Sequence, residues 1–131
     1  MQSDFLLTTA SELPLETVCQ RLPEISAQHQ FGVLGVHNLR EKMASKGVPF
    51  DRECRVFEVC NPRHAQRVLA ENISISSALP CRIAVYPEDG RTVLATLKPT
   101  ALLTLFAAPG AAAVAREVED TLVRIMAEAA G

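Results

Sequence analysis

The stretch CRIAVYPEDGRTVLATL, residues 81–97, contains the clearest pair of structural elements in the chain. Two apolar runs flank the segment PEDG, in which proline comes early and glycine last, a pattern that predicts a tight turn and therefore a β-hairpin. Side chains alternate between the two faces of a strand. We therefore expect Cys81, Ile83 and Val85 to share a face, with Cys81 as a small buried residue, and Arg82 to project from the opposite face.

Apolar spacing on either side of the hairpin predicts alternating strands and helices. Further strands are expected at 4–10, 31–37 and 53–59, and helices at 14–29, 39–45, 61–71 and, as a short turn, 99–106. Pro23 conflicts with one straight helix, because it lacks an N–H and clashes with the preceding turn. We expect a kink there, or a second short helix that begins at Pro23. The two glycines of the strand at 31–37 indicate a bend or a close backbone approach.

The final stretch, about 111–130, is an amphipathic helix with an inner row of residues spaced by three and four: Ala111, Ala115, Val118, Leu122, Ile125 and Ala129. This row is either a seam for a partner helix or the cover of a sheet. It is too short for an independent coiled coil, which favours the cover. Glu117, Glu119 and Asp120 are assigned to a solvated helix face.

This order of elements predicts an α+β fold in a single domain, 1–131, with helices on one face of a mixed or antiparallel sheet. The strands alternate between apolar and mixed faces, as expected when only one side is covered. The other side would then present semi-polar sheet to solvent. Such a face favours association with a second copy.

Composition excludes several classes of function. Thirteen Lys and Arg against 15 Asp and Glu give a formal charge of −2, and the chain has no Trp, so nucleic acid is not an expected partner. No window approaches about 20 apolar residues, and the N-terminus lacks a signal peptide, so neither a membrane nor secretion is expected. We therefore expect a cytoplasmic protein whose thiols stay reduced.

Four cysteines at wide spacings are either structural thiols or metal and redox groups: Cys19, Cys54, Cys60 and Cys81. Cys60 immediately precedes a predicted helix, whose dipole favours a thiolate and a lowered thiol pKa. His64 follows one turn later, so Cys60 and His64 form a possible metal-ligand or ion pair. Asn61 and the proline after it also have a complete explanation as a helix cap, without any function.

Other polar residues carry weaker signals. Arg82 on an open sheet face would bind an anion or a partner carboxylate, or remain solvated. His29 and His37 stand at element ends, where a histidine is usually exposed or hydrogen-bonded. No phosphate-binding glycine loop, serine hydrolase elbow or zinc protease motif is present, so the sequence names no cofactor.

Three segments together resemble a known family: FGVL at 31–34, VCNP at 59–62 followed by Ala65, and LPCRI at 79–83 followed by VY at 85–86. They are similar to the domain-of-unknown-function 302 family of small bacterial and archaeal proteins. The likeness covers about 15–106, with the last helix in the expected place. It implies a compact α+β fold with a curved sheet, similar to the TATA-box-binding-protein-like class, and a homodimer. The family implies no established activity.

We therefore predict a non-enzymatic, homodimeric module that binds a small molecule, a thiol compound or a metal. The candidate ligand-binding residues are Cys60, Asn61, His64, Cys81 and Arg82, and the candidate metal ligands among them are Cys60, His64 and Cys81. One alternative is a thiol-dependent redox or sulfur-transfer enzyme that uses Cys60. Another is an interaction protein that docks a partner through its dimer face or its last helix.

Overall fold

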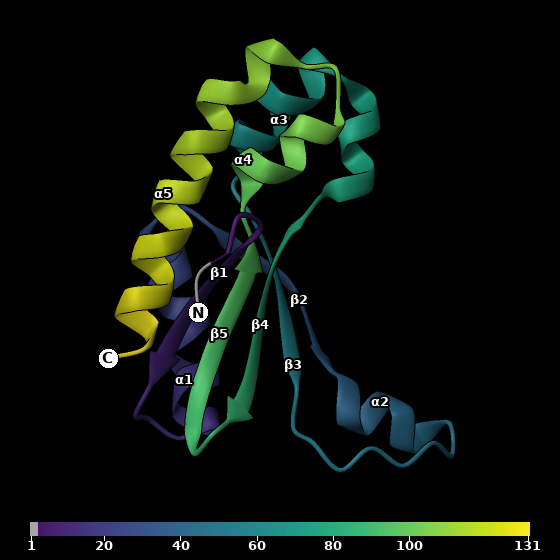
Figure 1. Ribbon diagram of the computed structural model, residues 1–131, viewed down its shortest axis with the longest axis vertical. Coiled ribbons are helices and arrows are strands. Elements are labelled where there is room, and N and C mark those ends of the chain that lie inside the picture. The colour runs from purple at the N-terminus through teal and green to yellow at the C-terminus, as the bar shows by residue number, and fades with distance from the viewer. Residues whose placement is uncertain (1–2) are drawn as a thin grey trace.

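Five strands form one antiparallel sheet in the spatial order β1-β5-β4-β3-β2 (Figure 1). The computed structural model describes residues 3–131; Met1 and Gln2, where the predicted leaderless N-terminus begins, lie outside the described residues. The strands are β1 Leu6–Ser11, β2 Gly32–Asn38, β3 Arg55–Cys60, β4 Cys81–Glu88 and β5 Arg91–Leu97. The predicted α+β class is confirmed, and of the two sheet types expected the antiparallel one is present.

The hairpin at the centre of the sequence forms as predicted, with a shorter turn. Strands β4 and β5 continue to Glu88 and Arg91, so Pro87 lies inside the strand and only Asp89 and Gly90 connect the two. Both connecting residues have positive φ, 52° and 78°. An Asp-Gly pair adopts this conformation readily, and its twist matches that of the flanking strands.

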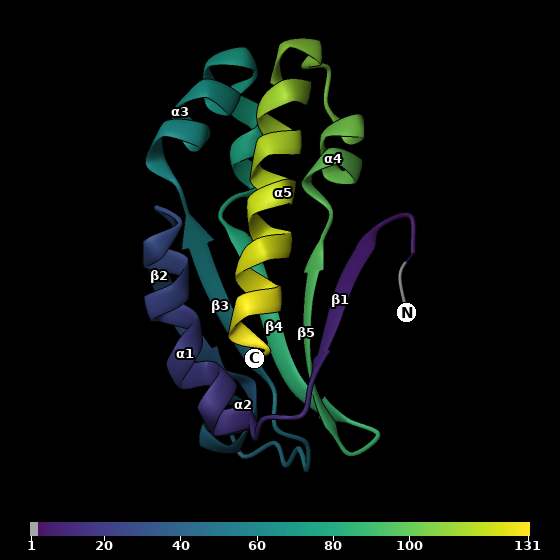
Figure 2. The same ribbon diagram turned by 90° about the vertical axis from the view of Figure 1, so that its left-hand side faces the viewer.

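The two long helices occupy one face of the sheet, and the shorter helices lie beyond its two ends, with α2 at the end opposite to α3 and α4 (Figure 1). In Figure 2, helices α1 and α5 lie across the sheet, while Figure 1 places α3 and α4 together beyond one end. The helices are α1 Leu15–Gln28, α2 Leu39–Ser45, α3 Pro62–Glu71, α4 Pro99–Leu102 and α5 Ala112–Ala129, and three short 3-10 helices are η1 Ile73–Ala78, η2 Leu103–Leu105 and η3 Pro109–Ala111. Among the residues 3–131, no helix is long and apolar enough to span a bilayer.

Pro23 does not begin a second helix, so that alternative is wrong. Helix α1 continues through Pro23 to Gln28. Residues on both sides of the proline, Leu22 and Ser26, are completely buried. Burial of this helix face offsets the one backbone hydrogen bond that proline removes, because helical stability in proteins comes mostly from tertiary packing.

The core lies between the sheet and the two long helices. Successive strands contribute Phe57, Ile83, Val85 and Leu94 to the same face, and each is at most 1% exposed. The complete inner row predicted for the last helix is buried in this core. Helix α5 therefore covers the sheet, as the sequence favoured.

The opposite side of the sheet, here called the uncovered face, carries the alternate residues of the strands. Val56, Ala84, Ala95 and Thr8 lie side by side across it at paired positions. At one edge of the sheet the register shifts between Val33 and Gly35, as at a β-bulge, which bends its strand. The glycines therefore mark a bend and not a close backbone approach, since a Cβ at Gly32 would meet nothing and one at Gly35 only side-chain atoms.

Side chains from β1 and α1 donate hydrogen bonds to the last backbone carbonyls at the C-terminal end of α5. Arg21 donates from Nη2 to the Glu128 carbonyl at 2.7 Å and from Nε to the Ala129 carbonyl at 3.2 Å. Ser11 donates to the Ala130 carbonyl at 2.7 Å. These bonds satisfy carbonyls that have no partner within the helix.

Candidate functional site

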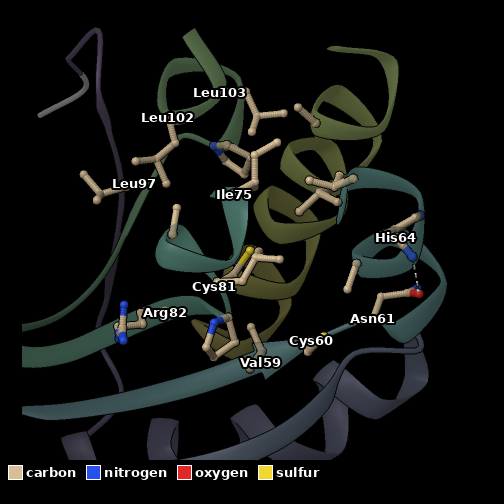
Figure 3. Close-up of a pocket in the computed structure, with 18 of the residues that line it drawn as sticks. Val59, Cys60, Asn61, His64, Ile75, Cys81, Arg82, Leu97, Leu102 and Leu103 are labelled. Atoms are coloured by element: carbon tan, nitrogen blue, oxygen red, sulfur yellow. Dashed lines mark hydrogen bonds between the residues drawn. The ribbon is translucent and has the colours of Figure 1, made fainter. Parts of the chain in front are cut away.

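A cavity of about 420 Å³ lies at the end of the sheet, between the strand ends and the helices gathered there (Figure 3). We call it the end cavity. Its lining includes Val59 and Cys81 from the covered side of the strands and Cys60 and Arg82 from the uncovered side. The cavity therefore meets the strands where β3 ends and β4 begins. Its volume lies in the usual range for small-molecule sites.

Most of the wall is apolar. Aliphatic and aromatic side chains from six elements and the segments beside them line it: Phe31, Val59, Val68, Ile75, Leu79, Leu102, Leu103, Phe106 and Val118. Several also belong to the core cluster, so the cavity is an extension of the core to the molecular surface. A wall of this kind favours the apolar part of a ligand.

All five ligand-binding candidates from the sequence lie on this wall. Cys60 comes from the end of β3, Asn61 and His64 from the start of α3, and Cys81 and Arg82 from the start of β4. Figure 3 shows Cys81 near the middle of the group, with Asn61 and His64 on one side and Arg82 on the other. The antiparallel pairing of β3 with β4 brings these distant segments together, since Cys81 is paired with Val59.

Asn61 has the structural role that the sequence allowed for it. Its Oδ1 accepts hydrogen bonds from the backbone N–H groups of Arg63 at 3.0 Å and His64 at 3.2 Å. Pro62 occupies the first helical position, where a missing N–H is not needed. The cap holds the first turn of α3 against the cavity and thereby positions His64.

The thiols of the cavity are not activated, so the prediction of a lowered pKa at Cys60 is wrong. Burial raises the pKa of Cys60, because the charged form loses hydration. Burial, and then the charge of Cys60, raise the pKa of Cys81 to about 11. Desolvation by burial is the cause of the raised pKa of Cys60. All four cysteines are free thiols.

His64 faces a carboxylate rather than the cysteines. Its Nε2 lies 3.4 Å from Oε2 of Glu117 on α5, which also accepts a bond from Arg67 at 3.1 Å. The ring packs against Phe31, with 5.9 Å between the ring centroids. Glu117 is 52% exposed, as the predicted solvated face implies, and it also takes part in an ion-pair group. Glu119 differs from the prediction, since it accepts bonds from the N–H and hydroxyl of Thr100.

The metal hypothesis finds no ligand set in the structure. Within residues 3–131, no group of three or more His, Cys, Asp and Glu side chains is arranged to hold a metal ion. His64 directs Nε2 to Glu117, and its Nδ1 has no hydrogen-bond partner among the described residues. We therefore do not carry a metal into the function proposed below.

Arg82 lies on the uncovered face, as its place in the strand predicts. Its side chain is 56% exposed, and Nη2 lies 3.5 Å from Oε2 of Glu58 on the neighbouring strand. The other oxygen of Glu58 lies 2.9 Å from Nε2 of His37, whose Nδ1 lies 2.7 Å from Lys42 Nζ. The hydrogen bond from His37, followed by the nearby positive charges, holds the pKa of the Glu58 carboxyl below its usual range.

The two remaining histidines behave as the sequence suggested for residues at element ends. His37 is hydrogen-bonded within the group just described. His29 lies at the end of α1, and its Nε2 is 2.7 Å from Oε2 of Glu128 near the end of α5. Both contribute to surface packing, and neither lines the end cavity.

Two parts of the cavity wall were missed by sequence reasoning. The segment between α3 and β4 forms η1, which places Ile75 in the wall with 1% exposure and leaves Ile73 at 72%. The predicted turn at 99–106 contributes Leu102 and Leu103. The apolar residues of these two short segments were the available signal in the sequence. Which of their side chains point into the cavity depends on the elements against which the segments pack.

The fold and the cavity define a class of small α+β domain: a five-stranded antiparallel sheet with helices on one face and an apolar cavity at one end. The family model for the domain of unknown function DUF302 matches residues 7–129. The chain therefore belongs to the DUF302 family, as its motifs indicated. The likeness of the fold to the TATA-box-binding-protein-like class stays a prediction, because the family match does not test it.

A solved structure supports this assignment. The crystal structure of an uncharacterized conserved DUF302 protein from Bacillus stearothermophilus is similar to this chain over 98% of its length and 100% of the other chain, with 32% identity and a TM-score of 0.91. No curated protein matches the chain significantly. The relatives thus establish the family and the fold, and the function must be argued from the site.

Proposed function

We propose that this domain is a binding module, without catalysis of its own, for a small and largely apolar molecule held in the end cavity. The observation that carries the proposal is the cavity itself, about 420 Å³ in volume and walled mainly by apolar side chains. An apolar molecule of suitable size gains free energy when it leaves water for such a wall. A few polar side chains at one side would orient it.

The chemistry of the polar groups favours binding over catalysis. Cys60 and Cys81 remain protonated near neutral pH, because burial raises the pKa of both thiols. A thiol-dependent redox or sulfur-transfer enzyme needs a thiolate. Among the described residues, neither ring nitrogen of His64 is hydrogen-bonded to a cysteine, because Nε2 faces Glu117 and Nδ1 has no partner. The neutral thiols instead add polarisable surface to the cavity wall.

The binding proposal is tested by filling the cavity. Ala65 of α3 lines it, whereas Ala70 of the same helix is exposed and does not. We expect the uncharged dye phenylnaphthylamine to gain fluorescence with the native protein and with Ala70→Phe, and to lose most of this gain with Ala65→Phe. Circular dichroism would verify that both variants fold. Equal dye binding by Ala65→Phe and the native protein, or no binding by either, would overturn the proposal.

We also propose that a second copy of the chain covers the central part of the uncovered face, around Ala84, and leaves Arg82 near the start of β4 open to solvent. This face presents half-buried residues that are mostly apolar, among them Val56, Ala84 and Tyr86. Such a surface fits the homodimer implied by the family resemblance, and the four free thiols fit a reducing compartment such as the cytoplasm.

Light scattering tests the dimer. The native chain is expected at twice the mass of one chain. Ala84→Arg, in the middle of the uncovered face, is expected to give the single mass, while Ala113→Arg on the exposed part of α5 leaves the dimer intact. A native protein that scatters as a single chain, or an Ala84→Arg variant that remains dimeric, contradicts this assignment of the interface.

A further inference from the structure

We infer that the ligand of the end cavity is an amphipathic acid, with its apolar body inside the cavity and an anionic head group at Arg82. This inference rests on the proposed binding function and adds the charge and orientation of the ligand. It is carried by the distribution of charge around the cavity and by the position of Arg82 at its rim.

The charge of the cavity wall has one sign. Among the described residues that line the cavity, Arg82 is the one with a permanent charge, and none is an aspartate or glutamate. Glu117 lies behind His64 and outside the lining. An anionic group in the cavity would therefore meet a guanidinium and no carboxylate of the wall, whereas a cationic ligand would find no counter-charge there.

Arg82 stands where the cavity opens to solvent. Leu97 and Leu105 also line the cavity and are 51% and 76% exposed, so these residues belong to its rim. Figure 3 shows Leu97 on the same side of the cavity as Arg82. A ligand that enters from this rim can bury its apolar body among Ile75, Leu102 and their neighbours while its head group stays beside the guanidinium and in contact with water.

The guanidinium has donors left for a ligand. Its contact with Glu58 joins only Nη2 and Oε2 at 3.5 Å, longer than the 2.7–2.9 Å typical of charge-assisted hydrogen bonds. Glu58 directs its other oxygen to His37, and Lys42 adds a second cation beside that ring. Arg82 and Lys42 carry two positive charges against the one negative charge of Glu58, so these side chains have a positive charge in excess. A carboxylate or similar oxyanion at the rim is therefore attracted, despite the presence of Glu58.

The main chain of Arg82 is held in place. Its carbonyl accepts a hydrogen bond from the hydroxyl of Thr96 at 2.6 Å, and Thr96 is 4% exposed. The residue is also paired with Glu58 in the β3–β4 register. A rigid backbone at the rim reduces the ordering needed to place the head group, which is the general benefit of a preorganised site.

Decanoate and decanol, which share one alkyl chain, test the inference at neutral pH through displacement of phenylnaphthylamine. We expect decanoate to bind the native protein about tenfold more tightly than decanol, as one charge-assisted hydrogen-bonded pair would provide. Arg82→Gln should remove this preference and leave decanol binding unchanged. The matched control is Arg91→Gln, because Arg91 is an equally exposed arginine, 57%, near the hairpin turn. Added salt should weaken only decanoate binding.

The outcomes separate this inference from the function on which it rests. Equal binding of the two ligands, or an unchanged preference in Arg82→Gln, would overturn the anionic head group while the apolar binding function stands. Failure of the native protein to bind the dye and both ligands would remove the binding function itself. Loss of decanol binding in Arg82→Gln would assign the arginine to the structure of the cavity and contradict its role in charge recognition.

Discussion

The pH dependence of alkylation at Cys81 is the sharpest test of the chemistry assigned to the end cavity. Burial, and then the charge of Cys60, raise the pKa of this thiol from an ordinary 9.0 to about 11. Two pH units correspond to about a hundredfold smaller thiolate fraction at any pH below the ordinary value. Since the thiolate is the nucleophile, alkylation of Cys81 by iodoacetamide should be slowed by at least that factor.

The assay is a series of timed iodoacetamide reactions across the alkaline range, read by mass spectrometry at each cysteine. Limited access also slows a buried thiol, so the quantity that tests the argument is the pH midpoint of the rate, not its size. Urea-unfolded protein supplies the reference midpoint for the same four cysteines. In the native protein we expect higher midpoints at Cys60 and Cys54, whose pKa values burial also raises, and the highest at Cys81.

A midpoint for Cys60 or Cys81 below that of the unfolded chain would refute this reasoning. It would mean that the dipole of α3 or another charge outweighs desolvation. The thiol-dependent enzyme would then regain support. Midpoints equal to those of the unfolded chain would show that water reaches both sulfur atoms and that the cavity is wetter than its apolar wall implies.

Four further predictions concern stability. Leu122→Ala should lower the free energy of unfolding by about 2–5 kcal/mol, because Leu122 is fully buried, whereas Val123→Ala at an adjacent position with 45% exposure should have little effect; denaturant titration of both measures the difference. Asn61→Ala should cost about 1 kcal/mol by removing the cap of α3, and Asn61→Ser should restore most of it, as thermal unfolding can measure. Arg21→Met should cost about 1 kcal/mol, since two carbonyls at the end of α5 lose their donor, and hydrogen exchange should increase at that end. The raised pKa of Cys81 leaves the free energy of unfolding unchanged below about pH 9 and lowers it as the pH rises toward 11, because this thiol ionises first in the unfolded chain. Denaturant titrations at several pH values should show a smaller decline for Cys81→Ala.

Local features were predictable from the sequence because their causes are local. The two-residue turn needs residues that tolerate positive φ, and Asp89 and Gly90 are such a pair. The cap at Asn61 and the proline after it specify where α3 begins. The inner row of α5 follows from helical spacing alone, and so does its burial once a sheet is available to cover.

Other features depended on neighbours far along the chain. Pro23 stays within a helix because the faces of α1 on either side of it are buried against the sheet and α5. Glu117 meets His64 only because α5 passes beside α3. The direction of Ile75 into the cavity depends on the packing of η1, which no local pattern specifies.

The fold class, the hairpin, the start of α3 near Asn61 and five of the polar residues that line the end cavity were predictable from the amino-acid sequence, whereas Ser77 and Thr96, which also line it, were not singled out. Turn geometry, capping and periodicity depend on a few consecutive residues, so they can be predicted without knowing which distant segments pack against them. Only the tertiary structure decided that these residues border an apolar cavity, that Cys60 and Cys81 remain protonated, and that Arg82 stands at the rim. Desolvation and charge are properties of the surroundings of a side chain, and those surroundings exist only after β3, β4 and the covering helices have come together.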